Sequence, residues 1–239
     1  MKKGFFAAFL CALIMVLLPA AVYAMDGTGT EDNPYQISSA ADLEEFRDRV
    51  NDENGKTRNS SACAILKNDI VLNNDVLNSD GSLNEEKAST FEEWTPIGTA
   101  SNPYTGTFDG NGKTISGIYI NGGDVYKGLF GYIGEDGEVK NLGLVDSWIK
   151  GGNNVGGIAG YSSGNIEDCY NTGSVSGGNN VGGIAGFSYG SIEGCYNTGE
   201  VSGSIMVGGI AGDSINGSIE GCYNTGEISG SGIYVGGIV

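Results

Sequence analysis

The side chains that could do chemistry in this sequence are mostly carboxylates, because its 239 residues contain no histidine. Without His, the chain has no Ser-His-Asp triad, no Cys-His pair and no ordinary ligand set for catalytic zinc. Asp and Glu number 29 against 12 Lys and Arg, which gives a net charge of −17. This acidity argues against nucleic acid and anionic membranes as partners. It is typical of an exported protein, or of one that meets divalent cations.

One polar loop concentrates hard oxygen ligands of the kind that bind Ca²⁺. Its candidates are Asp75, Asn78, Asp80 and Glu85. Their spacing does not match an EF-hand loop, because Val76 stands where the first ligand would be if Gly81 were the central glycine. We therefore expect a solvated acidic loop, with calcium as the alternative and as the single cofactor considered.

A second set of carboxylates recurs at equivalent positions of a repeat. Its members are Glu167, Glu193 and Glu220. Carboxylates stacked about 5 Å apart repel one another unless a cation, a Lys or water intervenes. We expect an outward, hydrated ridge, with a cation-binding or carbohydrate-facing stripe as the alternative.

A unique site could form only in the irregular part of the chain, residues 94–148. There Trp94, Tyr104 and Asp109 are candidates to stack against and bind a sugar ring. Glycoside hydrolysis needs two carboxyl groups about 5–10 Å apart across a cleft. The acids of the repeats are instead equivalent from copy to copy, and the repeats have almost no Lys or Arg to serve a lyase. We therefore predict no catalytic site.

The segment Gly112-Lys113-Thr114 matches the last three residues of the phosphate-binding loop motif, but the residues before it do not match the motif. That motif needs a Gly five residues before Gly112, and Thr107 stands there. No helical pattern follows. We interpret the segment as a tight turn between two strands.

The elements that must position these side chains are repeats. VGGIAG begins at Val155, Val181 and Val207, and a fourth copy opens at Val235, so the intervals are 26, 26 and 28 residues. CYNTG follows each complete copy. A period of this length, rich in Gly and β-formers and without helical periodicity, is typical of a β-solenoid in which each repeat is one coil.

Equivalent residues of successive coils should stack as ladders up the wall, about 4.8 Å apart. We expect the branched aliphatic ladders to fill the lumen and the asparagines to form an amide ladder at a corner. The predicted aliphatic columns are Ile158, Ile184 and Ile210; Ile166, Ile192 and Ile219; and Val175, Val201 and Ile228. The amide column is Asn171, Asn197 and Asn224.

The cysteines Cys169, Cys195 and Cys222 form a further column. We expect these and Cys63 to be free thiols, because in-register parallel side chains seldom give disulfide geometry. Ile166 and Cys169 are three residues apart, so both can point inward only if a bend or bulge lies between them. Gly194 and Gly221 occupy that place in two copies.

The corner glycines of CYNTG should also have a special backbone. They are Gly173, Gly199 and Gly226. We expect them to adopt positive φ, because glycine takes that conformation without a steric penalty.

The N-terminus reads as a secretory signal over Met1–Ala24. Lys2 and Lys3 precede an apolar run, Phe5–Leu18, and Val22-Tyr23-Ala24 is a small-residue cleavage site. This apolar run is shorter than a membrane-spanning helix, which needs about 20 residues. We therefore expect an exported mature chain without a membrane span.

Residues 25–93 are predicted to cap the stack. Ser39 begins a helix with Asp42 at the capping-box position, and an apolar stripe of Leu43, Phe46 and Val50 would close the first coil. Two further segments complete this region: Ala62–Leu72, expected to be a first strand, and Asn73–Phe91, expected to be an inserted acidic loop.

Several of these motifs together resemble the GLUG-motif repeats of bacterial surface proteins. They are GTFDGNGKTISGI at 106–118, GLFG at 128–131 and the repeated VGGIAG and CYNTG unit. Asp26–Phe46 is similar to the segment that commonly opens such regions. The resemblance implies a secreted or cell-surface protein with a right-handed β-helical stalk or adhesive region. The family also includes regions attached to immunoglobulin-cleaving metallopeptidases. Their HExxH zinc site cannot lie in a chain without His.

The prediction is therefore an all-β fold, a right-handed parallel β-helix with a short N-terminal capping helix. Its divisions are a signal peptide (1–24), a cap (25–93), degenerate coils (94–150) and repeat coils (151–239) that stop mid-repeat, as in an N-terminal piece of a longer polypeptide. We expect a non-enzymatic stalk or adhesion module whose partner is a host or cell-surface glycan or protein. The alternatives are a carbohydrate-active or carbohydrate-binding β-helix and the non-catalytic region of a metallopeptidase.

Overall fold

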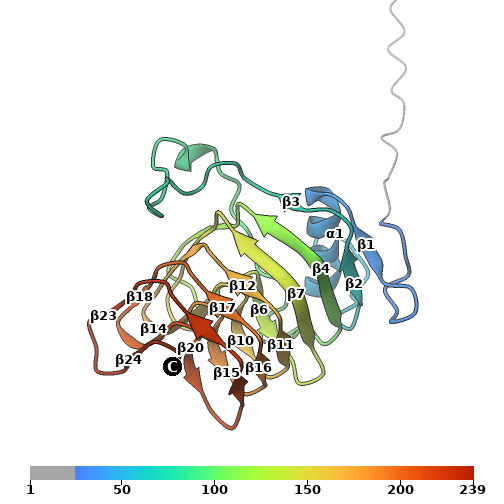
Figure 1. Ribbon diagram of the computed structural model, residues 1–239. Coiled ribbons are helices and arrows are strands. Elements are labelled where there is room, and N and C mark those ends of the chain that lie inside the picture. Colours follow the sequence, from blue (N-terminus) through green and yellow to red (C-terminus); the bar gives the residue numbers. More distant parts are fainter. Residues whose placement is uncertain (1–24) are drawn as a thin grey trace, which may run out of the picture.

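The computed structural model describes residues 25–239, which form a parallel β-solenoid with the helix α1 (Ala40–Asn51) at its N-terminal end (Figure 1). The predicted signal peptide lies outside the described residues. The expected all-β solenoid with an N-terminal helix is confirmed. Within residues 25–239, no helix is both long and apolar enough to cross a membrane.

One wall of the solenoid runs the whole length of the stack. It contains, in order, β1 (Tyr35–Ile37), β2 (Ala64–Leu66), β4 (Thr107–Ser116), β7 (Glu138–Val145), β11 (Asn165–Glu167), β16 (Ile192–Glu193) and β21 (Ile219–Glu220). The same sheet also includes β3 (Ile70–Val71), β12 (Tyr170–Asn171), β17 (Tyr196–Asn197) and β22 (Tyr223–Asn224).

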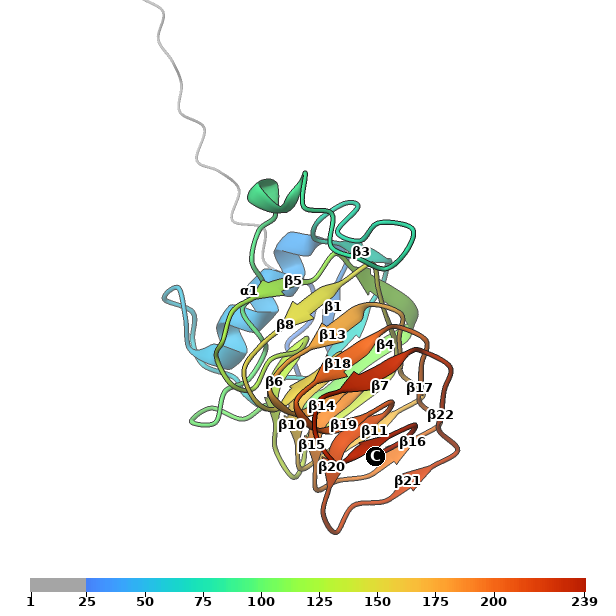
Figure 2. The same ribbon diagram turned by 90° about the vertical axis from the view of Figure 1, so that its left-hand side faces the viewer.

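Three shorter sheets form the remaining walls. The first contains β6 (Phe130–Ile133), β10 (Ala159–Ser162), β15 (Ala185–Ser188) and β20 (Ala211–Ser214). The second contains β5 (Tyr119–Asn121), β8 (Trp148–Lys150), β13 (Ser174–Ser176), β18 (Val201–Gly203) and β23 (Ile228–Gly230). The third contains β9 (Val155–Gly156), β14 (Asn179–Gly182), β19 (Ile205–Gly208) and β24 (Val235–Gly236). Figure 2 shows how the strands of each sheet follow one another along the stack.

The repeat spacing sets the register between coils. Ile166 pairs with Ile192 and Ile192 with Ile219, and Val175, Val201 and Ile228 pair in the same way. The corresponding side chains of the first two coils are fully buried, and those of the third are partly buried. Ile158, Ile184 and Ile210 are also fully buried. The predicted aliphatic columns therefore line the lumen.

The core changes from aromatic to aliphatic away from the cap. Phe46, Tyr104, Phe108 and Phe130 pack together with ring centroids 5.2–5.9 Å apart. In later coils the position of Phe130 is taken by small residues, which are Ala159, Ala185 and Ala211. The side chains that fill the lumen are therefore larger near the helix and smaller further along the stack.

Capping residues define both ends of the helix α1. Ser39 is the N-cap, and its Oγ accepts a hydrogen bond from the Asp42 N–H (3.3 Å). Asp52 ends the helix with φ 63°. The predicted stripe of Leu43, Phe46 and Val50 is fully buried. The helix therefore covers the apolar opening of the first coils, as expected.

The corner glycines differ from the sequence prediction, because Gly173, Gly199 and Gly226 do not have positive φ. Glycine is required at these positions because successive coils approach each other closely there. A Cβ on Gly199 would lie 2.0 Å from the carbonyl oxygen of Gly173, and one on Gly226 would lie 2.0 Å from that of Gly199.

Positive φ occurs instead at the predicted bend between the inward-pointing Ile and Cys. Asp168, Gly194 and Gly221 have φ of 49°, 62° and 63°. This bend lets both Ile166 and Cys169 be fully buried although they are three residues apart. The expected bend is confirmed.

The predicted turn at Gly112-Lys113-Thr114 is wrong. The strand β4 continues through this segment, and its register with β7 shifts between Asp109 and Lys113. Asn111 and Gly112 take positive φ of 53° and 69° there. The extra residues are therefore accommodated as a β-bulge within one strand, and not as a connection between two.

The expected first strand and acidic loop are only partly regular. Ala62–Leu72 contains two short strands, β2 and β3, and not one. Residues 73–91 form a loop that projects from the stack (Figure 1) and contains the short 3₁₀ helix η1 (Ala88–Thr90). Val76 and Leu83 of this loop pack with Tyr119 in a small separate apolar cluster.

Candidate functional site

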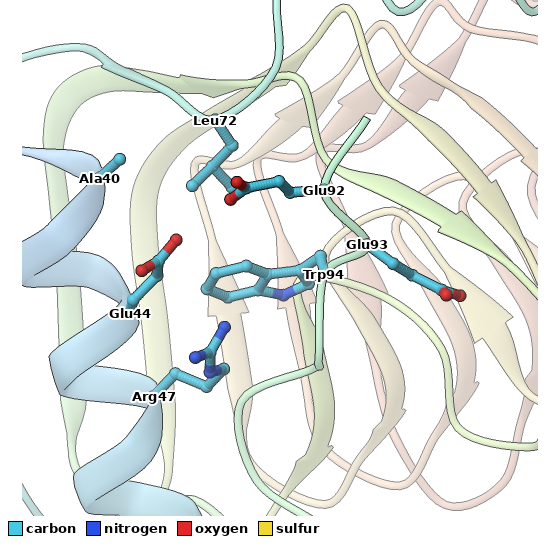
Figure 3. Close-up of a pocket in the computed structure, with 7 residues that line it drawn as sticks. All are labelled: Ala40, Glu44, Arg47, Leu72, Glu92, Glu93 and Trp94. Carbon is cyan, nitrogen blue, oxygen red and sulfur yellow. The ribbon is translucent and has the colours of Figure 1, made fainter. Parts of the chain in front are cut away.

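A cavity of about 300 Å³ lies between α1 and the segment 92–94, near the cap (Figure 3). It is lined by Ala40, Glu44, Arg47, Leu72, Glu92, Glu93 and Trp94. Glu44 and Arg47 project from the helix toward the Trp94 ring, as Figure 3 shows. This cavity lies beside the irregular region in which the sequence allows a unique site.

Asn73 holds one side of the cavity in place. Its side-chain nitrogen donates to the carbonyl oxygens of Glu92 (3.0 Å) and Gly117 (2.8 Å), and its side-chain oxygen accepts from the Glu92 N–H (2.8 Å). Trp94 is only 5% exposed, and its indole N–H donates to the carbonyl oxygen of Leu129 (3.1 Å). The segment 92–94 is therefore fixed to the coils beneath it.

The charges around this cavity are unbalanced. The guanidinium of Arg47 lies 5.1 Å from the centroid of the Trp94 ring, but it is paired with Asp48, to which it donates at 2.8 and 3.0 Å. Glu44, Glu92 and Glu93 add negative charge. The cavity therefore offers carboxylate acceptors beside an indole and disfavours an anionic ligand.

The structure does not bring the predicted sugar-binding side chains together. Tyr104 is fully buried, its hydroxyl donates to the carbonyl oxygen of Ala62 (2.9 Å), and burial raises its pKa well above the ordinary value. The Asp109 carboxylate accepts from Asn111 (2.7 Å) and Asn141 (3.0 Å) at the bulge of β4. Only Trp94 lines the cap cavity.

Two of the four calcium candidates use their carboxylates within the loop. Asp75 forms an ion pair with Lys87, and the Asp80 carboxylate accepts from the N–H (3.0 Å) and hydroxyl (2.6 Å) of Ser82, which lowers its pKa. Asn78 donates to Ser82 and Leu83. Across residues 25–239, no three His, Cys, Asp or Glu side chains gather as a metal site. Calcium binding by this loop, including Glu85, stays a prediction.

The glutamate column forms in register on β11, β16 and β21. Glu167 pairs with Glu193 and Glu193 with Glu220, and the last two are exposed. Lys140 occupies the same column one coil earlier, in register with Glu167. Its ammonium donates to Glu138 (2.8 Å), and this bond raises its pKa. A basic residue therefore reduces the repulsion at one end of the column.

The predicted amide ladder is present. The side-chain nitrogen of Asn171 donates to the side-chain oxygen of Asn197 (2.9 Å), and Asn197 donates in the same way to Asn224 (2.8 Å). Each also donates to the carbonyl oxygen of the Gly two residues ahead in its own coil, at 2.8–3.0 Å. The ladder is structural, because Asn171 and Asn197 are fully buried.

The cysteine column is also structural. Among the described residues, Cys63, Cys169, Cys195 and Cys222 are all free, as expected, and Cys169 and Cys195 are buried. A hydrogen bond with Cys169, reinforced by burial, raises the pKa of Cys195. A thiol with a raised pKa is a poor nucleophile, so the column does not indicate thiol chemistry.

A cluster of aromatic side chains that was not predicted from the sequence lies on the sheet of β6, β10, β15 and β20. Tyr132, Tyr161 and Phe187 lie in register, with centroids 4.2 and 5.4 Å apart and interplanar angles of 21° and 5°. Tyr126 and Tyr189 flank them at 5.1–6.0 Å. We call these five residues the aromatic face.

A signal for the aromatic face is present in the sequence. Aligning GLFGY of residues 128–132 with the later GIAGY and GIAGF places an aromatic residue at the same position in three coils. Burial and a hydrogen bond with Tyr161 raise the pKa of Tyr132 to about 12.

A groove of about 470 Å³ lies near the aromatic face, at the start of the strands β9, β14 and β19 of the neighbouring sheet. It is lined by Asn153, Asn154, Asn179, Asn180, Ile205, Met206 and Asp213. The Asn180 side chain donates to the Asn154 side chain (2.8 Å), and the Asn179 N–H donates to the Asn153 side chain (3.0 Å). We call this the asparagine groove. Asp213 connects the two surfaces, because it is in register with Phe187.

A second aromatic column lies on the strands β12, β17 and β22 of the long sheet. Tyr170, Tyr196 and Tyr223 stack with centroids 4.9 Å apart and interplanar angles of 5° and 4°. Gly143 leaves room for the first ring, since a Cβ there would lie 2.3 Å from it. We call these three residues the tyrosine ladder.

These features define a β-solenoid repeat protein whose outer walls carry columns of equivalent side chains. Residues 151–176 and 177–202 each match the family model described as the GLUG motif. The chain therefore carries GLUG repeats, which agrees with the resemblance in its sequence.

Two relatives are similar over most of the chain. Halomucin of Haloquadratum walsbyi is 34% identical over 158 residues, which are 65% of this chain and 2% of that protein. A protein of Evansella cellulosilytica named as a Gly-rich membrane protein is 34% identical over 154 residues, which are 61% of this chain and 16% of that protein. The chain thus spans a small part of these relatives.

One solved structure has a similar fold. It is a protein from Bacteroides ovatus described as an immunoglobulin A1 protease, with a TM-score of 0.58 and 21% identity. The match covers 86% of this chain and 79% of the other. At this identity the likeness shows the fold alone.

Proposed function

We propose that this chain is part of an exported or cell-surface protein, in which the solenoid acts as a structural stalk or an adhesion module. The observation that carries the proposal is the register of the repeats, which places the same side chain at the same position of successive coils. Such a stack extends a polypeptide in one direction and displays the same surface repeatedly.

Three further observations support this proposal. The sequence begins with a predicted secretory signal. The two relatives are named halomucin and a Gly-rich membrane protein. The acidic composition keeps such a surface well hydrated.

The test is the location of the protein in its native host. A chromosomal copy with an epitope inserted in the projecting loop of residues 73–91 is followed in intact cells treated with an external protease. We expect the epitope to be in the medium or to be removed from the surface. Retention behind the cell membrane, next to a protected cytoplasmic marker, would contradict the proposal.

A catalytic role is the competing proposal, because the similar solved structure is described as a protease. In a chain without His, an HExxH zinc site would have to lie elsewhere in a longer protein. We expect the purified chain to leave immunoglobulin A and soluble polysaccharides intact. The measurements are gel analysis of the antibody heavy chain and the release of reducing ends, and turnover in either would overturn the non-enzymatic proposal.

A further inference from the structure

We propose that the aromatic face and the asparagine groove together bind a neutral glycan chain. This inference rests on the proposed role at the cell surface and assigns its adhesive partner to a class. Three properties of these surfaces support it: aromatic rings turned against a stack, a row of asparagine side chains, and little charge.

The aromatic face supplies apolar contact. The stacked rings of Tyr132, Tyr161 and Phe187 cover one another, so this column shows ring edges and two phenolic hydroxyl groups. Tyr126 is turned by 70° and 89° from Tyr132 and Tyr161, and Tyr189 is turned by 52° from Phe187. Tyr189 is 40% exposed. Rings turned in this way provide surfaces on which the apolar face of a pyranose can pack.

The asparagine groove supplies directional polar contact. Each Asn carries both donors and acceptors, which suits hydroxyl groups that also do both. Asn154 and Asn180 are held by positive φ of 56° and 54°, which fixes where their side chains begin. The groove volume of about 470 Å³ lies in the range of small-ligand sites.

The charge of the two surfaces favours a neutral partner. The only ionisable acid or base among their twelve side chains, apart from the phenols, is Asp213. The chain as a whole has a net charge of −17. A polyanion would meet repulsion from the molecule and find no Lys or Arg on these surfaces. A neutral sugar chain meets neither difficulty.

The surfaces also run in the direction of the stack. The aromatic column occupies three successive coils, and Asp213 continues it into a fourth. Coils repeat about every 4.8 Å, which is comparable with the length of one sugar unit. A linear glycan can therefore lie along the wall and contact one coil per sugar.

The test is calorimetric titration of the purified chain with three neutral hexasaccharides, cellohexaose, mannohexaose and xylohexaose, and with hexagalacturonate as the charged probe. We expect at least one neutral probe to bind. Two variants remove single rings: Tyr126→Asn, which places there the residue that the next two coils have, and Tyr189→Ser. We expect each to weaken binding about fivefold.

Matched controls separate this site from other aromatic surfaces. Tyr223→Ser removes an exposed ring of the tyrosine ladder, and Asn54→Gly is matched to Asn180→Gly because both positions have positive φ. We expect the two control variants to bind within about twofold of the parent chain, while Asn180→Gly binds more weakly.

Three results would overturn the inference: no binding of any neutral probe, equal loss in Tyr223→Ser, or tighter binding of hexagalacturonate. These failures are distinct from failure of the proposed function. A chain that is found at the cell surface but binds no neutral glycan disproves only the inference. A chain that stays in the cytoplasm disproves the proposed function, whatever it binds.

Discussion

At the scale of single residues, the amide ladder shows how a polar group can be buried in a solenoid. Asn197 receives a hydrogen bond from Asn171 and donates to Asn224 and to the carbonyl oxygen of Gly199. Its side chain is completely buried. The coil above and the coil below therefore depend on the same amide.

We predict that Asn197→Ala is strongly destabilising. The change leaves partners of the lost amide unsatisfied in the interior, which costs about 1–3 kcal/mol in the free energy of unfolding for each such group. Urea unfolding followed by far-UV circular dichroism measures it. Asn153→Ala, at the exposed edge of the asparagine groove, is the control. A change below about 0.5 kcal/mol for Asn197→Ala would show that the ladder contributes little.

The two kinds of glycine in the repeat predict opposite responses to substitution. At Gly199 a Cβ would overlap the carbonyl oxygen of Gly173, so Gly199→Ala must push coils apart. At Gly221 a Cβ meets nothing nearer than 3.6 Å, and the matching residue of an earlier coil is Asp168, with φ 49°. Asn and Asp tolerate this left-handed conformation.

We therefore expect Gly199→Ala to lower the urea midpoint markedly and Gly221→Asp to leave it almost unchanged. Equal destabilisation by the two variants would mean that the left-handed backbone constrains Gly221 as strongly as contact between coils constrains Gly199.

At the scale of elements, the aromatic column on β6, β10 and β15 makes stability sensitive to alkaline pH. The pKa of Tyr132 is raised to about 12, mainly by burial and to a smaller extent by its hydrogen bond with Tyr161. A phenol with a folded-state pKa above its unfolded value stabilises fully below the unfolded value of about 10. That contribution is lost as the pH rises through the folded-state pKa.

We predict that the free energy of unfolding falls between about pH 10 and pH 12. Tyr104 and Tyr196, whose pKa values are also raised, change stability in the same direction. Urea midpoints measured across this range test the prediction. Tyr132→Phe removes one titrating group, so its stability should fall less steeply than that of the parent chain. An equal slope would contradict the assignment to Tyr132.

The elements that the sequence predicts best are those with local or repeated signals. Ser39, Asp42 and the apolar stripe of α1 act within one helix, and the ladders follow directly from the period. The prediction for the corner glycines is wrong because their constraint comes from the next coil, and the sequence of one coil does not show that contact. The bulge in β4 was mistaken for a turn because Asn111-Gly112 favours positive φ in either structure.

The sites were harder to predict than the fold. Trp94 and Tyr104 are aromatic in the same irregular region, yet one lines a cavity and the other fills the core beneath α1. Composition cannot separate these outcomes, because an aromatic ring serves either purpose. The aromatic face can be predicted only if Tyr132 is aligned with Tyr161 and Phe187, although the spacing between these residues differs from coil to coil.

At the scale of the whole molecule, the solenoid behaves as a stack of interchangeable units. Each repeat coil contacts the coils before and after it through the same register, and the residues of β13, β14, β15, β16 and β17 have equivalents on both sides. Stability in such a stack is approximately a sum of coil and interface contributions.

We predict that a second copy of residues 177–202, inserted after residue 202, is accepted. The chain should lengthen by about 4.8 Å along the stack, and its urea midpoint should be equal to or above that of the parent. Small-angle X-ray scattering measures the first change and denaturant unfolding the second. A scrambled insert of the same composition is the control. Aggregation or a lower midpoint with the native insert, as with the scrambled one, would refute modularity.

The position of α1 also gives the stack a direction of growth. The helix covers the end of the stack that leaves the ribosome first, so the free strand edge lies on the side of the later coils. Each emerging coil then meets an ordered template that already has its hydrogen-bonding pattern. We expect the coils to add one after another from the N-terminus during synthesis, so that the unfinished chain never has two competing edges to extend.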